Sequence, residues 1–248
     1  MLEHLGKELA LRFHVGGVEI AFNVVVVAVA VAVSIGLVLL ALWLRQGLTR
    51  DPDAPLSRRA TVIAVTIDLF ENQILGGVSP RLVRRLLPLV VTLFFYVLLS
   101  SWAGVLPIPY IVSPTQDLNV ALGLALAVYG LTHYYGIRAK GVGAHLKGYL
   151  APFPFLLPLN IVGDLGRTLS HGFRLFGNIL GGAILMVVAP YVAMRIAAVV
   201  PVVGPVLGWA GRVPAMLFVS SWFGLAMGTI QAFVFTLLAV AYIQTTAE

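Results

Sequence analysis

The chain has 248 residues, of which 60% are hydrophobic and only 10% are charged, and its mean hydropathy is +0.99. A soluble domain averages about 25% charged residues, so this composition excludes a water-soluble protein and indicates an integral membrane protein with several spans. The net charge of +6 does not indicate nucleic-acid binding, because the basic residues lie in short loops beside apolar runs. The sequence has no cysteine and no P-loop, HExxH or GxSxG motif, so we expect no disulfide, metal, nucleotide site or other cofactor on this chain.

The chain begins with an arm and a first membrane span. Residues 1–17 place leucines and Phe13 at helical spacing, and we expect either an amphipathic surface helix or an irregular terminus. Residues 20–44 are almost wholly apolar and long enough to cross a bilayer. Four arginines follow within residues 45–59, which marks this loop as cytoplasmic and places the N-terminus outside.

A cytoplasmic segment and a hairpin of two spans come next. Within residues 45–85, residues 60–82 alternate apolar runs with polar residues and are expected to form an interfacial helix. Residues 86–136 are expected to form the two-span hairpin. Asp117 and Asn119 open its second span, where Asp117 either caps the helix or lines an aqueous path together with Asn119.

Residues 154–246 are expected to form a long two-helix hairpin that carries the functional residues. The first helical pattern covers up to about 40 residues, or roughly 60 Å, so this helix must be strongly tilted or kinked near Pro190. The last helix returns the C-terminus to the cytoplasm. The sequence therefore predicts an all-α polytopic membrane protein with about five membrane helices, an interfacial helix and a long, tilted final hairpin.

A polar stripe runs along the first helix of this hairpin. At 100° per residue its members fall within about 60° of one another, and a stripe of this kind must line an aqueous path or face a partner rather than lipid. Arg174 keeps its charge at any relevant pH, and no acid lies three or four residues from it. The nearest acid in the sequence, Asp164, is off its face, so we expect Arg174 to pair with an acid from elsewhere; the alternative is a buried ion pair within this chain. The stripe consists of Asn160, Arg167, Ser170, His171, Arg174, Asn178 and Gly181.

Three further side chains have open alternatives. For Ser170 and His171, local hydrogen bonding and a part in ion transfer are equal interpretations. On the last helix Gln231 lies on one face with Gly224 and Gly228, and its amide can hold the Arg174 guanidinium or a water, or form a structural bond between helices.

Three segments resemble subunit a of the F-type ATP synthases, in the order of spans from about residue 60 to the end. They are PLNIVGDLGRTLSHG, FRLFGNILGG and IQAFVFTLLAVAYI. The resemblance implies that Arg174 is the stator charge and Gln231 a helper beside it. It implies a bilayer-embedded complex with a ring of c subunits, each with one mid-membrane carboxylate, and with b-type peripheral stalk subunits. H⁺ or Na⁺ then passes through two offset half-channels, and the nucleotide chemistry belongs to a soluble head.

The chain departs from the family pattern at three positions. Many members have an acid or histidine where this chain has Ala183, a polar residue where it has Gly224, and an acid where it has Asn160. Asp164, one turn after Asn160, is an alternative acid. The rival hypothesis is a free-standing secondary ion transporter, which usually shows internal repeats that are not found here. A structural scaffold does not account for Arg174. The expected location is a bacterial plasma membrane.

Overall fold

The computed structural model describes most of the chain, and the expected arm at residues 1–9 and the outer turn before the last helix lie outside the described residues. The described residues are 10–15, 18–48, 57–105, 113–197, 214, 217–218 and 220–247.

The described chain opens with an antiparallel pair of strands, β1 (Ala10–Val15) and β2 (Val18–Asn23), in which Ala10 lies opposite Asn23. This hairpin departs from the all-helical expectation and from the helical spacing of the arm. The two segments, ALRFHV and VEIAFN, are rich in the β-branched and aromatic residues that favour strands, and their mutual pairing overrides the helical spacing. Residues 20–23, expected in the first span, belong to β2, because the Asn23 side chain caps the helix that starts after it.

The N-terminal helices are α1 (Val24–Arg45), α2 (Arg58–Gln73) and α3 (Pro80–Ala103). The interfacial segment expected at residues 60–82 is therefore split, and α2 ends at Gln73. The next span was expected from residue 86, but α3 begins six residues earlier and includes the three arginines of its first turns. Pro80 explains the earlier start, since proline has a backbone suited to the first helical position.

The C-terminal part contains α4 (Leu118–Lys140), the short α5 (Val142–Gly148), α6 (Leu157–Ala197) and α8 (Gly228–Ala247). Short 3₁₀ turns precede α4 and α6, at Pro114–Gln116 and Pro154–Leu156, and a π-helical segment, Ser220–Met227, precedes α8. The 41-residue α6 is continuous through Pro190. In the described part of the chain, four helices are long and apolar enough to cross a membrane: Val24–Arg45, Pro80–Ala103, Leu118–Lys140 and Gly224–Ala247.

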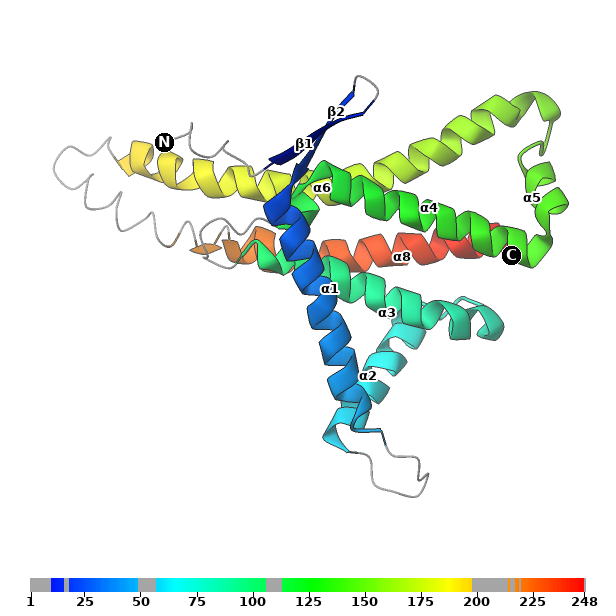
Figure 1. Cartoon of the computed structure of the whole chain (residues 1–248), viewed down its shortest axis with the longest axis horizontal. Helices are drawn as coiled ribbons and strands as arrows, with labels where there is room; N and C mark the ends of the chain where they lie inside the picture. The colour runs from blue at the N-terminus through cyan, green and yellow to red at the C-terminus, as the bar shows by residue number, and fades with distance from the viewer. Residues whose placement is uncertain are drawn as a thin grey trace.

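The core of the helical bundle forms where α4 packs against both α6 and α8, and where α8 also packs against α3 (Figure 1). The side chains of Val97, Leu175 and Phe235 are fully buried there. The last two long helices were expected to pack on each other as a hairpin, yet α4 lies between them over much of their length. The sequence pattern cannot identify this third helix, because periodicity reports the buried face of a helix and not its neighbour.

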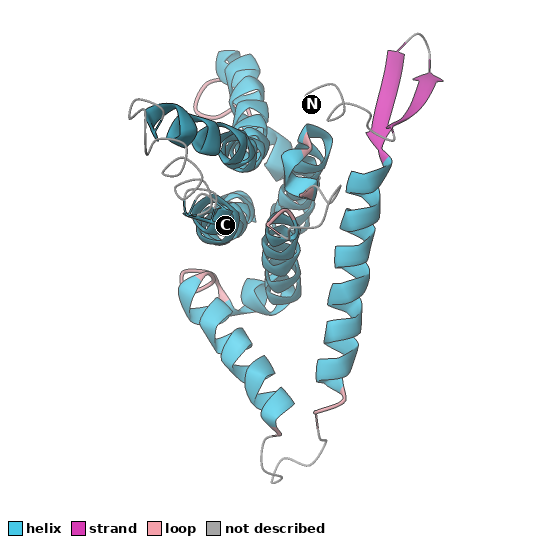
Figure 2. Cartoon of the chain, turned by 90° about the vertical axis from the view of Figure 1, so that its left-hand side faces the viewer, coloured by secondary structure: helices cyan, strands magenta, loops and turns pink. Residues whose placement is uncertain are grey.

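The first helix has a different direction from the bundle. α1 runs steeply across α3, α4 and α8 in Figure 1. In Figure 2 the axes of α1 and α2 diverge from each other. Helices with such different directions cannot all stand upright in one bilayer, so some of them must be tilted. The ends of α4 and α8 gather with α5 at one end of the molecule, which is where the polar residues described below are found.

Candidate functional site

The central residue of the site is Arg174, which lies in the middle of α6. His171, Leu175 and Ile179 are buried at four-residue spacing, so this face of α6 packs into the bundle. Arg174 lies at the edge of this buried face, and its side chain is exposed. Within the part of the chain that the structure describes, no hydrogen bond or ion pair reaches its guanidinium. The charge of Arg174 is therefore presented on the outside of the described bundle.

Glycines flank Arg174 along this open face. A Cβ atom added at any of four positions would meet no heavy atom within 4 Å: Gly163, Gly166, Gly177 and Gly181. Small residues on a membrane helix let a second helix come close to its backbone. The surface around Arg174 thus suits close passage of a partner helix.

Asn178 and Gln231 form a direct bond between α6 and α8 one turn beyond Arg174. Asn178 Nδ2 donates to Gln231 Oε1 at 2.6 Å, and the Gln231 side chain is 2% exposed. Gln231 Nε2 is buried without a hydrogen-bond partner among the described residues. The structure thus contains the bond between helices that was one of the interpretations of Gln231. The N–H groups of the Gln231 amide make no hydrogen bond among the described residues.

His171 and Ser170, neighbours in the predicted polar stripe, face in different directions. His171 is buried, its ring stacks on Phe235 at a centroid distance of 3.9 Å, and its Nε2 lies 3.1 Å from the Phe235 carbonyl oxygen. Because a carbonyl only accepts, Nε2 carries the proton and donates. His171 therefore joins α6 to α8, whereas Ser170 is exposed on the face of Arg174.

Asp164 is the centre of a cluster of polar side chains at the start of α6. Tyr149 Oη donates to Asp164 Oδ2 at 2.6 Å, and Arg167 Nη2 donates to Asp164 Oδ1 at 2.8 Å. His133, on α4, places Nε2 2.7 Å from Tyr149 Oη and 3.4 Å from Asp164 Oδ2. The carboxylate is thus contacted by an arginine, a histidine and a phenol that come from three segments of the chain.

The hydrogen-bond directions in this cluster restrict its protons. The Tyr149 hydroxyl gives its single proton to Asp164, so it accepts from His133 Nε2, while His133 Nδ1 faces the Tyr129 carbonyl oxygen at 3.0 Å. Burial and the adjacent Asp164 carboxylate raise the pKa of Tyr149 far above its ordinary value, so the phenol remains a donor. Asp164, Tyr149 and His133 therefore form a continuous chain of groups that can pass a proton.

His145 on α5 adjoins this cluster. Its ring meets the His133 ring edge to face, with centroids 5.2 Å apart, and its buried Nε2 has no partner among the described residues. Burial lowers the pKa of His145, and the nearby His133 and Lys140 lower it further. We did not single out His133, His145 or Tyr149 from the sequence. The signal for His133 was an ionisable residue near the end of an apolar span, which is by default a functional candidate.

Asn160 has a structural part beside this cluster. Its Nδ2 donates to the carbonyl oxygens of Tyr149 and Ala151 at 2.8 and 3.0 Å, and so fixes the segment before α6. A cavity of about 400 Å³ opens here between the ends of α4 and α8, α5 and the start of α6, and both Asp164 and Arg167 line it. A much smaller space of about 10 Å³ is lined by Asp164 and His171, further into the bundle. Asp164 and Arg167 line both spaces, and the smaller one can hold at most one water molecule.

The remaining predicted site residues lie elsewhere. Asp117 caps α4 by accepting a hydrogen bond from the Asn119 backbone N–H at 2.8 Å, which is the simpler of its two interpretations. Both lie at the opposite end of α4 from Asp164. Gly224 is buried, and a Cβ atom there would lie 2.0 Å from Val105 Cγ2, so no polar side chain fits at this position. The Ala183 side chain lies outside the described residues.

Comparison with known proteins gives a consistent result. The model of the ATP synthase A chain family matches residues 24–244. The chain is similar to the ATP synthase subunit a of Bacillus pumilus, with 38% identity over 184 residues that cover 71% of this chain and 74% of the relative. It is similar to the Bacillus subtilis subunit, with 37% identity over 186 residues and the same two coverages. For the Mycobacterium tuberculosis subunit the identity is 32% over 225 residues, which cover 85% of this chain and 82% of the relative.

Proposed function

This chain belongs to the ATP synthase A chain family and is the stator subunit of an ATP synthase membrane sector, and we propose how its residues move ions. The open face of α6 lies against a ring of c subunits, each presenting one carboxylate at mid-membrane. The observation that carries this proposal is Arg174, a permanent charge exposed on an intramembrane helix without a partner among the described residues and flanked by glycines with open space.

Arg174 acts on the ring carboxylate through its charge. Two opposite unit charges 4 Å apart attract by about 4 kcal/mol at an effective dielectric constant of 20, which favours the ionised carboxylate by about a thousandfold. Each ring carboxylate therefore releases its ion as it reaches Arg174. The same fixed charge repels a cation that tries to pass directly from one side to the other, so ions cross only when the ring turns.

The inner half-channel begins at the 400 Å³ cavity and uses the Asp164 cluster. An ion in the cavity meets Asp164. The hydrogen bonds between Asp164 and Tyr149 and between Tyr149 and His133 let a proton pass among these three groups. Ser170 is exposed between this cluster and Arg174, about one turn before the arginine, and it is the next polar group on the way to the ring. Asp164 thereby serves as the acid that many members of the family carry at the position of Asn160.

The outer half-channel passes the other side of Arg174. Asn178 and Gln231 lie there, and the buried Gln231 Nε2 has donors available for a water or for a passing carboxylate. The two routes thus reach the ring on opposite sides of Arg174 along α6. This offset turns ion flow into rotation, since one elementary charge that crosses 100 mV releases about 2.3 kcal/mol.

The orientation follows from the basic residues. Arg45, Arg138 and Lys140 end their helices, and the positive-inside rule places these ends in the cytoplasm with the C-terminus and the inner cavity. The N-terminus then lies outside the plasma membrane. Peripheral stalk subunits of the b type hold this multi-pass chain still while the ring turns. The ring's carboxylate site, rather than this chain, selects H⁺ or Na⁺.

The test uses the complete complex in sealed vesicles. We expect Arg174→Ala to abolish ATP synthesis driven by an imposed ion gradient, while the detached soluble head hydrolyses ATP at the wild-type rate. Arg174→Lys is expected to fail as well, because lysine is a point charge that can lose its proton and lacks the guanidinium fork. Arg195→Ala is the matched control, since Arg195 is exposed on the same helix and bonded to Tyr191. Coupled synthesis in the Arg174→Ala complex, or its loss in the control, contradicts the proposal.

The alternative function, a free-standing secondary ion transporter, is distinguished by a simple reconstitution. The purified chain alone in liposomes is expected to move no ions, because the second half of its ion pair lies on the ring. Ion uptake by the isolated chain that Arg174→Ala abolishes would favour the transporter instead.

A further inference from the structure

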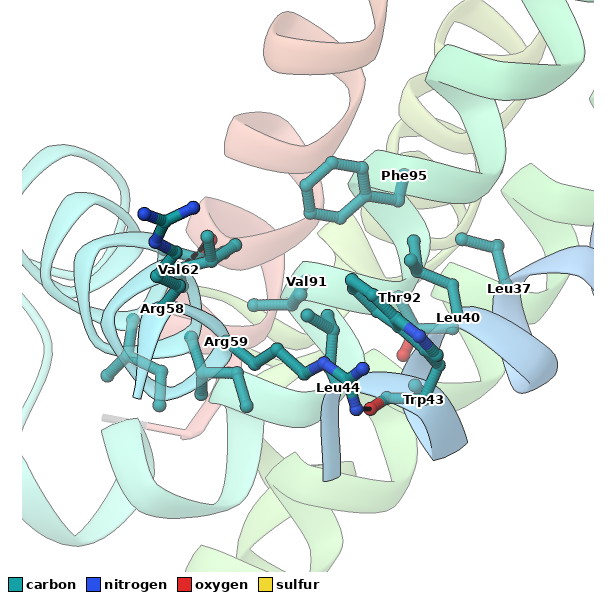
Figure 3. Close-up of a pocket in the computed structure, with 14 residues that line it drawn as sticks. Leu37, Leu40, Trp43, Leu44, Arg58, Arg59, Val62, Val91, Thr92 and Phe95 are labelled. Carbon is teal, nitrogen blue, oxygen red and sulfur yellow. Dashed lines mark hydrogen bonds between the residues drawn. The ribbon is translucent and has the colours of Figure 1, made fainter. Parts of the chain in front are cut away.

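A cavity of about 530 Å³ lies between α1, α2 and α3, far in sequence from the residues of the ion path (Figure 3). Most of its wall is hydrocarbon, supplied by side chains such as Leu37 and Leu40 of α1, Val62 of α2, and Val91 and Phe95 of α3. Its volume lies within the range of about 300–1,000 Å³ that is usual for ligand sites. An apolar wall of this kind suits hydrocarbon chains.

One end of the same cavity is basic. Arg58 and Arg59 line it, and the Arg59 guanidinium stacks over the Trp43 ring, 4.2 Å from its centroid. Arg59 Nη1 also donates to the Trp43 carbonyl oxygen at 3.4 Å, which leaves most of its five N–H donors available. The lining residues that the structure describes include no aspartate or glutamate. Figure 3 shows Arg59 reaching across to Trp43, whereas the guanidinium of Arg58, also on α2, points away from that of Arg59.

The combination of a hydrocarbon wall and a basic end selects an amphiphilic anion. We propose that this cavity binds an anionic phospholipid, with one acyl chain in the apolar part and the phosphate group on Arg59, and with Arg58 adding positive charge at the same end. Guanidinium groups form bidentate, charge-assisted hydrogen bonds with phosphate, and a tryptophan such as Trp43 is common at headgroup level. Basic pockets between membrane helices on the cytoplasmic side are suited to anionic lipid headgroups.

The exposed, apolar surface of α1 gives lipid access to the cavity. α1 has a mean hydropathy of 3.1 and is largely exposed, so it lies in the bilayer with little protein around it. A helix of another subunit is a poorer occupant. A 20-residue helix about 30 Å long and 10 Å wide fills about 2,400 Å³, several times the cavity, so it can lie over the opening but cannot occupy the space.

The test uses the intact complex in nanodiscs that contain a photoreactive lipid. The probe is phosphatidylglycerol with a diazirine in its acyl chain, compared with the corresponding phosphatidylcholine, and mass spectrometry locates the adducts. We expect phosphatidylglycerol to label the cavity wall more strongly, and Arg58→Gln and Arg59→Gln each to reduce this labelling about fivefold, which corresponds to about 1 kcal/mol for one arginine near an anionic headgroup. The single substitution Arg84→Gln is the charge-matched control on α3, outside the cavity lining, and is expected to leave the labelling unchanged.

A second variant tests the cavity without a change of charge. Ala41→Trp fills part of the space and is expected to reduce labelling by both lipids, whereas Ala28→Trp on the same helix, away from the cavity, is not. Equal labelling by the two lipids that the arginine substitutions leave unchanged would show ordinary bilayer contact and overturn the proposal. A photoreactive amino acid at position 41 that cross-links to another subunit, rather than to lipid, would also overturn it.

Discussion

Replacement of Asp164 by asparagine separates ion transfer from stability, because the two effects differ in size. The substitution keeps the shape of the side chain and removes its charge. The Tyr149 hydroxyl then donates to a neutral oxygen, and since bonds to charged groups contribute about 1.5–3 kcal/mol and neutral ones about 0.5–1.5, the loss is about 1 kcal/mol. The Arg167 side chain is 59% exposed, so its pair with Asp164 contributes only about 0–1 kcal/mol.

A total cost of about 1–2 kcal/mol leaves a folded protein, given typical stabilities of about 5–15 kcal/mol. The effect on ion transfer is expected to be much larger, because a positioned acid or base contributes about 10²–10⁴-fold to a proton transfer. Water in the adjoining cavity can replace part of this contribution, so we expect the lower end, about a hundredfold loss. The assay is the initial rate of ATP synthesis by reconstituted complexes after a sudden ion gradient.

Asp117→Asn is the control for this experiment, because asparagine and aspartate cap helices almost equally well and a helix cap is the contact that Asp117 makes in the structure. Asp164→Glu is expected to recover part of the rate, since it restores the carboxylate. The reasoning is refuted if Asp164→Asn complexes assemble normally and synthesise ATP within about twofold of the wild-type rate, well below the effect of a working acid or base.

Two further predictions concern stability. Gly224→Ala should lower the melting temperature of the complex's membrane sector, because the new methyl group collides with Val105 and such overpacking costs about 1–3 kcal/mol. The control Gly130→Ala, in open space on α4, should leave the melting temperature unchanged. Equal melting temperatures for the two variants would contradict this prediction. The lowered pKa of His145 favours its neutral form in the folded protein, so its stabilising effect is present above the ordinary value of about 6.5 and is lost as the pH falls below it. The melting temperature should therefore fall more between about pH 7.5 and 5 in the wild type than in His145→Gln, and parallel curves would contradict the assignment.

Arg174 could be identified from the sequence because its argument is local. A permanent charge in an apolar helix, without an acid three or four residues away, needs a partner from outside, and this depends only on the residue type and helical spacing. Its exposed position on α6 agrees with that expectation. The long, continuous α6 could be predicted for the same reason, since hydrophobic periodicity is a property of one segment.

The Asp164 cluster could not be assembled in the same way. His133, Tyr149 and Asp164 come from α4, from the residue after α5 and from α6, and only tertiary packing brings them within hydrogen-bond distance. The polar stripe also could not decide between the two interpretations of His171. A helical projection placed it within 60° of Arg174, but the buried face of α6 reaches that far, so the imidazole bonds to α8 instead of facing the partner.

This chain has its acid at position 164 instead of position 160, and this difference changes the geometry of the proposed ion path. Four residues advance a helix by about 6 Å, so an acid at position 164 lies about 15 Å along the axis from Arg174, compared with about 21 Å for position 160. The direction changes as well, from about 40° to about 80° away from Arg174, toward α4 and α5. The carboxylate is therefore nearer to the arginine in depth but turned into the bundle, where His133 and Tyr149 are available to it. In the proposed inner path an acid at position 164 can use these two residues, whereas the side chain at position 160 bonds to the backbone of the segment before α6.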